Sequence, residues 1–187
     1  PPARAPPGAA GYRVGVVMRI PRLASTLAAG LLAALPAGAS ALPAFTQGPT
    51  VLPAPGPAVT TLLTGVRTGG HPGYDRLVFT FTGRRPRVEV RYVPRVVQDG
   101  SGAPVRLEGR AFLQIVLRDT VAHVCSASRC RATSPRVLTP RLPRLRQVKR
   151  AGDFEAVVTY GAGLTGRTGV RVFALSGPSR VVVDLRR

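Results

Sequence analysis

Apolar and polar residues alternate along several short stretches of this chain. In "GYDRLVFTF", residues 73–81, the side chains of Leu77, Phe79 and Phe81 fall on one side and the residues between them on the other. The phrase "GPSRVVVDL", residues 177–185, repeats the order of a turn, an arginine and an apolar strand. Alternation with a period of two is typical of a β-strand that buries one face. Both stretches are therefore predicted to be strands.

The same pattern recurs after residue 60, and turn signals separate the stretches. The further predicted strands are 61–69, 87–93, 105–109, 111–119, 144–150, 154–160 and 170–176. A tight turn at 151–153 is predicted to join two of them into a hairpin. Turns every eight to twelve residues favour an antiparallel sandwich or barrel. The predicted fold class is all-β, a small antiparallel β-sandwich in a single domain over 61–187, with room for one short helix within 120–145.

Residues 18–41 have the design of an export signal. Arg19 and Arg22 form a positive start, and the apolar run "LASTLAAGLLAALP" is too short for a comfortable membrane span. The small residues that follow allow cleavage after Ala39 or after Ala41, and both positions stay open. We expect a signal peptide, and a mature protein that is secreted to the cell envelope and is not transmembrane once the signal is cleaved.

Two segments flank the predicted signal without suggesting a fold. Residues 1–17 are interpreted as an over-extended gene start or a disordered leader. Residues 42–60 are rich in Pro, Gly and Thr and hold no charge, so they are interpreted as a stiff, extended Pro-rich linker. The two cysteines, Cys125 and Cys130, lie five residues apart, and in an exported chain this favours a disulfide. A metal site would need more ligands than His123 supplies, so none is predicted.

Charge is the strongest compositional feature. The chain has 27 basic and 8 acidic residues, a net charge of +19. Without residues 1–41 the net charge is +15, and on an exported protein this favours anionic wall polymers or lipid headgroups over nucleic acid. Few aromatic residues accompany the arginines, so base stacking is not supported. The excess of arginine has two alternative explanations, compositional drift and selection for binding, and the sequence does not decide between them.

The densest basic segment is 135–150, which contains no acid. Guanidinium groups can fork onto phosphate or carboxylate groups, so Arg141, Arg144 and Arg146 are candidate ligand-binding residues, as is Arg167 in the glycine-rich stretch 161–169. A solvated basic face and a flexible hairpin loop are the competing structural interpretations of the two segments.

The turn before the first quoted strand supplies four more candidates: His71, Tyr74, Asp75 and Arg76. An Asp-Arg pair at a strand start can clamp an anionic ligand, but more often it satisfies a turn and fixes strand register. His71 lies among Gly and Pro residues, which do not make a rigid catalytic seat. The chain also lacks a nucleophile elbow and a P-loop. We therefore predict that the protein is not an enzyme and needs no cofactor.

The closing phrase "GPSRVVVDL" resembles the strand signature of AMIN (amidase N-terminal) domains. In order along the chain, the pieces "VRTGGHPGYDRLVFTF", "VEVRYVPRVVQDGSGAPVRLEG", "AFLQIVLRD", "RLRQVKRAGDFEAVVTYGAGL" and "VRVFALSGPSRVVVDL" are similar to the actinobacterial AMIN-like domain of secreted proteins. The resemblance implies a small β-sandwich and an exported, non-catalytic module that contacts peptidoglycan. It also implies that the two similar phrases are core strands of one sandwich, and it carries over no catalytic residue.

Export, charge and resemblance together lead to one functional hypothesis and one alternative. The hypothesis is a secreted envelope module that binds peptidoglycan or an anionic wall glycopolymer, through basic loops and through the 71–76 turn and the 161–169 loop if these lie at one end of the sandwich. The alternative is a protein-interaction or regulatory subunit of an envelope enzyme, for which exposed edge strands suit β-strand addition.

Overall fold

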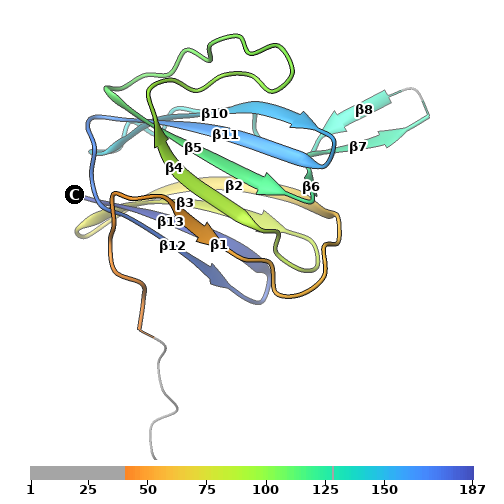
Figure 1. The fold of residues 1–187 in the computed structure, drawn as a ribbon, viewed down its shortest axis with the longest axis horizontal. Coiled ribbons are helices and arrows are strands. Elements are labelled where there is room, and N and C mark those ends of the chain that lie inside the picture. The colour runs from red at the N-terminus through yellow and green to blue at the C-terminus, as the bar shows by residue number, and fades with distance from the viewer. Residues whose placement is uncertain (1–40, 128) are drawn as a thin grey trace, which may run out of the picture. The chain divides into compact units, whose positions relative to one another are not determined.

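The alternating strands assemble into two stacked sheets (Figure 1). The computed structural model describes residues 41–127 and 129–187, and this part of the chain contains strands and no helix. One sheet has six strands, in the order β1 (Thr50–Leu52), β4 (Val88–Val93), β5 (Ala111–Arg118), β11 (Val157–Leu164), β10 (Leu145–Phe154) and β9 (Val137–Leu138). The other has five, in the order β12 (Val170–Leu175), β13 (Ser179–Arg186), β3 (Tyr74–Phe81), β2 (Thr61–His71) and β6 (Thr120–Val121). The predicted all-β sandwich is confirmed.

A separate hairpin leaves the sandwich at one end. It consists of β7 (His123–Ser126) and β8 (Arg129–Ala132), and Figure 1 shows it projecting beyond β6. The 120–145 region, in which a helix was left open, contains the short strands β6 to β9 and no helix among its described residues. Within the described residues, no helix is long and apolar enough to cross a membrane. The predicted signal peptide over 18–41 and the leader over 1–17 lie, except for Ala41, outside the described residues.

Strand β13 lies between β12 and β3 and runs antiparallel to both. Its register places Val183 opposite Leu77 and Val181 opposite Phe79. All four side chains are buried in the core. The two similar phrases in the sequence are therefore neighbouring core strands, as the resemblance implied.

The core lies between the inner faces of the two sheets. Phe79 of β3 meets Tyr160 of β11 edge to face, with ring centroids 5.4 Å apart and an interplanar angle of 63°. The Tyr160 hydroxyl lies 3.0 Å from Ser134 Oγ and donates to the carbonyl oxygen of Pro135 at 3.0 Å. Burial raises the pKa of Tyr160. This neutral phenol thus fastens the loop after β8 to the core without leaving a buried donor unpaired.

The outer face of the six-stranded sheet is covered by the loop between β4 and β5, residues 94–110 (Figure 1). Two bare glycines of β11 allow this loop to approach. A Cβ at Gly161 would lie 2.8 Å from Leu107 and 2.9 Å from Val96, and one at Gly163 would collide with the carbonyl oxygen of Glu108. Residues 105–109 were predicted to be a strand, but they belong to this loop. Leu107 is apolar because its side chain packs against Gly161 of β11, and this contact does not require a strand.

Three sequence boundaries differ from expectation. The turn of the β10–β11 hairpin is at Glu155 and Ala156, not at 151–153, and both have positive φ, 49° and 55°. Two successive residues with positive φ form the turn of a two-residue hairpin. The register shift between Arg150 and Gly152 is a β-bulge, and it allows Ala151 and Gly152 to continue strand β10. Residues 161–164 belong to β11, which shortens the expected loop to 165–169. Residues 50–52 of the expected linker form the edge strand β1, because Thr50, Val51 and Leu52 pair with β4.

We predict that Gly163→Ala lowers the free energy of unfolding by about 1–3 kcal/mol, because the new methyl group forces the 94–110 loop off the sheet. Urea denaturation of the two proteins measures the difference. Gly166→Ala is the matched control, since no heavy atom lies within 4 Å of a Cβ placed there. Equal unfolding midpoints for Gly163→Ala and the wild type would contradict the close packing of the loop.

Candidate functional site

The β2–β3 turn brings His71 and Tyr74 together. Their rings stack with centroids 4.9 Å apart and an interplanar angle of 16°. Both side chains are partly exposed at one end of the sandwich. Asp75 and Arg76, the other two candidates from this segment, point to opposite faces of β3 because successive residues of a strand alternate. The turn therefore presents His71 and Tyr74 together, whereas Asp75 faces into the structure.

Asp75 is fully buried, and its carboxylate is used by the fold. Its Oδ2 accepts hydrogen bonds from the backbone N–H groups of Arg144, at 2.6 Å, and Leu145, at 2.9 Å. Its Oδ1 accepts one from Nε of Arg187 at 2.8 Å. Because β3 belongs to the five-stranded sheet and β10 to the six-stranded sheet, Asp75 connects the two sheets. No part of this carboxylate is exposed to a ligand.

Arg76 lies on the outer face of the five-stranded sheet, where it binds Asp184 of β13. Its Nε and Nη2 donate to the two carboxylate oxygens at 2.7 and 2.9 Å, and Arg171 of β12 donates to the same carboxylate at 2.8 Å. The hydrogen bonds with Asp184 raise the pKa of Arg76. Asp184 is fully buried beneath the two guanidinium groups. The Arg76–Asp184 ion pair joins residues that are directly opposite each other in β3 and β13, so it supports the register of these two strands.

Aromatic rings surround these two guanidinium groups. The Arg171 guanidinium lies 4.6 Å from the ring centroid of Phe45 and 5.0 Å from that of Tyr74. That of Arg76 lies 4.9 Å from the centroid of Tyr74 and 5.5 Å from that of Phe173. Cation–π contacts of this kind restrict both groups and shield the ion pair from water. Arg76 keeps some exposure, with 21 % of its side-chain surface accessible.

Three arginines gather around two clefts at the same end of the sandwich. We call Arg110, Arg146 and Arg167 the arginine end. Arg110 and Arg146 line a cleft of about 550 Å³ with Glu108, and Arg110 and Arg167 line one of about 240 Å³ with Tyr92. The Arg167 guanidinium stacks 4.5 Å from the centroid of the Tyr92 ring. The seven ion pairs of the described residues involve none of these three arginines.

Backbone hydrogen bonds hold the turn and the loops of this end together. The N–H of Arg187 donates to Gly73 at 2.8 Å, that of Arg186 to Gly169 at 2.9 Å, and that of Thr165 to Arg144 at 3.0 Å. The 71–76 turn and the 165–169 loop therefore lie at one end, the arrangement on which the sequence hypothesis depended. Arg144 lies at this end, where its carbonyl oxygen accepts the hydrogen bond from Thr165. Arg141, in the same segment between β9 and β10, is exposed and lines neither cleft.

The predicted cysteine pair is a disulfide. Cys125 and Cys130 are directly opposite each other in the β7–β8 hairpin, with Cα atoms 4.0 Å apart. At the base of the hairpin, Nδ1 of His123 is hydrogen-bonded to the carboxylate of Asp153 at 2.8 Å. Within the described residues, no group of three or more His, Cys, Asp and Glu side chains could hold a metal ion.

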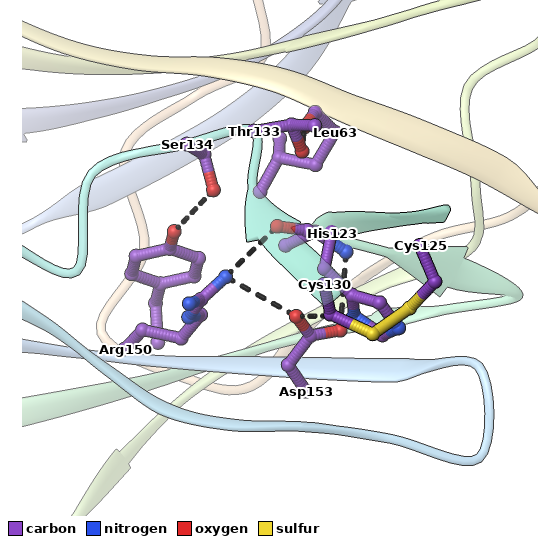
Figure 2. Close-up of polar contacts among 10 residues, drawn as sticks. Leu63, His123, Cys125, Cys130, Thr133, Ser134, Arg150 and Asp153 are labelled. Atoms are coloured by element: carbon purple, nitrogen blue, oxygen red, sulfur yellow. Dashed lines mark hydrogen bonds and ion pairs between the residues drawn. A yellow bond between two sulfur atoms is a disulfide. The ribbon is translucent and has the colours of Figure 1, made fainter. Parts of the chain in front are cut away.

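Sequence reasoning missed the partners that give the candidate residues their roles. Asp184 lies in the second of the two similar phrases, and its position opposite Arg76 could have been inferred by pairing the two phrases as antiparallel strands. Nothing in the sequence indicated a binding role for Arg110, because it is a single arginine immediately before strand β5. Arg150 and Asp153, which bind each other near His123 (Figure 2), were attributed to a basic face and to a turn.

We predict that Asp75→Asn lowers the free energy of unfolding by about 3 kcal/mol. Three N–H donors point at this carboxylate, and an amide turns an NH₂ group toward at least one of them. Chemical denaturation measures the loss. Asp99→Asn is the matched control, because Asp99 is exposed and makes no ion pair within the described residues, and its variant should stay within about 0.5 kcal/mol of the wild type. A stable Asp75→Asn protein would refute the connecting role of Asp75.

We predict that the double variant Cys125→Ser/Cys130→Ser loosens the hairpin and leaves the sandwich intact. The residues of β7 and β8 are almost all exposed, and a two-stranded hairpin on its own is marginally stable. Hydrogen exchange measured by NMR should become faster at amides within 123–132 and stay unchanged in β3 and β13. Loss of protection in β3 would show instead that the disulfide supports the whole domain.

Comparison with known proteins assigns the domain to one family. The family model described as AMIN-like domain matches residues 61–187, which span strands β2 to β13. No curated protein and no solved structure matches the chain. The match covers most of the chain and includes the strands that carry Asp75, Arg76 and Asp184. The chain therefore belongs to the AMIN-like domain family.

Proposed function

We propose that this domain is a non-catalytic module of the cell envelope that binds an anionic wall polymer, either peptidoglycan or an anionic glycopolymer, through its arginine end. The observation that carries the proposal is the grouping of Arg110, Arg146 and Arg167 around two adjoining clefts without an ion-pair partner among the described residues. Membership in the AMIN-like family supports association with the cell wall, and AMIN-like domains are in general non-catalytic binding modules.

The local electrostatics favour an extended anion over a small one. Guanidinium groups recognise carboxylate and phosphate oxygens with two parallel N–H donors. Arg110 and Arg167 lie on two separate loops and Arg146 lies on β10, so the three groups match charges repeated along a chain better than one compact group. Glu108 lines the larger cleft, and its carboxylate accepts a hydrogen bond from Gln147 at 3.2 Å. This acid leaves the net charge of the end positive.

Two features support an envelope location. The Cys125–Cys130 disulfide is exposed, and such bonds persist in oxidising compartments outside the cytoplasm. Residues 42–187 carry a net charge of +15, which suits a surface of anionic polymer. The exported state and the signal peptide over 18–41 are part of the proposal.

We predict that the purified protein sediments with isolated cell-wall sacculi and that binding weakens steeply with salt, because exposed charges are screened over about 10 Å at 0.1 M salt. The triple variant Arg110→Gln/Arg146→Gln/Arg167→Gln should bind at least about tenfold more weakly at low salt. The matched control Arg84→Gln/Arg129→Gln/Arg131→Gln removes the same charge from exposed positions elsewhere, and it should change binding by less than about threefold.

Sacculi stripped of anionic glycopolymer separate the two wall ligands. Binding retained after stripping identifies peptidoglycan, and binding lost identifies the glycopolymer. Salt-independent binding, or equal losses for the two triple variants, would contradict recognition by the arginine end. No binding to either preparation would reject the proposal and leave the protein-partner alternative.

A further inference from the structure

A further polar cleft lies at the other end of the sandwich, beside the disulfide hairpin. It has a volume of about 460 Å³ and lies between the base of the β7–β8 hairpin and the end of β10. We call it the hairpin cleft and define it by His123, Arg136, Arg150 and Asp153, which line it. Figure 1 shows the hairpin at the end of the sandwich opposite the chain's C-terminal residue, so the hairpin cleft is separate from the arginine end.

Arg150 is the central group of the hairpin cleft. Only 6 % of its side-chain surface is exposed, although it carries a full charge. Its Nη1 donates to the carbonyl oxygen of Ala122 at 3.1 Å and to Oδ2 of Asp153 at 3.2 Å, and Figure 2 shows both bonds leaving the same nitrogen. Among the described residues, neither Nε nor Nη2 donates a hydrogen bond. Arg150 thus lines the hairpin cleft with a guanidinium group whose parallel pair of donors has no partner among the described residues.

Asp153 does not take up these donors, because both of its oxygens are engaged. Oδ1 accepts from the N–H of Ala122 at 3.1 Å, and Oδ2 accepts from Arg150 and lies 2.8 Å from Nδ1 of His123. The carboxylate therefore positions Arg150 and His123 (Figure 2). With Nδ1 facing Asp153, Nε2 of His123 is on the far edge of the ring and forms no hydrogen bond among the described residues.

Arg136 supplies a second cation. Its carbonyl oxygen accepts the N–H of Arg150 at 2.8 Å, which fixes the two residues side by side, and its side chain is exposed and lines the hairpin cleft. Arg136 makes no ion pair within the described part of the chain. The hairpin cleft thus holds two guanidinium groups and one carboxylate.

The balance of charge selects the kind of anion. Asp153 lines the hairpin cleft, and the carboxylate of Asp99 lies against Gly152 at its rim, where a Cβ would collide with it. Two acids beside two arginines bring the formal charge of the group to zero, which disfavours a doubly charged phosphate or a polyanion more than a group with a single negative charge. The donor pair of Arg150 matches the two oxygens of a carboxylate.

We propose that the hairpin cleft binds a single carboxylate group, held by Nε and Nη2 of Arg150 and by the guanidinium of Arg136. The carboxylate belongs to a peptide C-terminus or to an acidic sugar, and these share the same recognition chemistry. Gln98, which also lines the hairpin cleft, offers an amide to the neighbouring part of the ligand. The proposal is independent of polymer binding at the arginine end.

The test titrates small probes into the purified protein and follows backbone NMR shifts. The probes are N-acetyl-Ala-Ala with a free carboxylate, the same dipeptide as its C-terminal amide, glucuronate and inorganic phosphate. We expect the free dipeptide or glucuronate to shift residues 122–123, 136 and 150–153, and we expect no such shifts from the amide. Whichever carboxylate binds more tightly identifies the source. Equal binding of the amide, tighter binding of phosphate, or no shifts with either carboxylate would overturn the proposal.

Variants locate the binding. Arg136→Gln changes an exposed side chain and should lower the affinity for the carboxylate probe at least about tenfold. Arg150→Lys keeps the charge but loses the parallel donors, so a folded variant should show a similar loss of affinity. Arg167→Gln, of equal charge change at the arginine end, should leave the affinity unaltered. An unchanged affinity for Arg136→Gln would refute the site, whereas sacculus binding through the arginine end can fail or succeed without affecting this result.

Discussion

The three hydrogen bonds to Asp75 hold the two sheets together at one end, and much of the structure depends on them. A buried carboxylate is strongly unfavourable unless donors surround it, and here two backbone N–H groups and Arg187 do so. The start of β10 is thereby fixed over the start of β3. Alternation then places Arg76 on the opposite face, where it meets Asp184. One Asp-Arg dipeptide thus determines both how the sheets are joined and how β13 is registered.

The sandwich separates its charged groups into a rigid layer and two open ends. On the outer face of the five-stranded sheet, Arg76 and Arg171 are paired with Asp184 and packed on aromatic rings, so their charge serves the fold. Loops and turns collect at the ends because the strands run between them. At the arginine end the three guanidinium groups make no ion pair among the described residues, whereas at the hairpin end Arg150 is nearly buried and paired with Asp153. The positive charge of the protein is therefore not equally available to a ligand over the whole surface, and the two ends of the sandwich present different groups of side chains.

Local alternation was sufficient to predict the all-β class and most of the long strands, because one face of each is buried. It failed where packing decides. Residues 105–109 look like a strand but lie over the glycines of β11, and Gly152-Asp153 looks like a turn but continues β10. Site chemistry was harder to predict. Asp75 depends on N–H groups about 70 positions along the chain, and His123 meets Asp153 across two different elements, so no local spacing indicates either contact.

The central place of β13 governs when this domain can form. In its sheet β13 separates β12 from β3, so β12 has no route into that sheet until residues 179–186 have been made. Pairing of β13 with β3 closes a loop of about a hundred residues, and contacts so distant in sequence slow folding. The β2–β3 hairpin can pair earlier, but the five-stranded sheet stays incomplete until β13 has been synthesised. Completion of this sheet is thus a late step, and until then the edge of β3 that β13 covers is open to pairing with other strands.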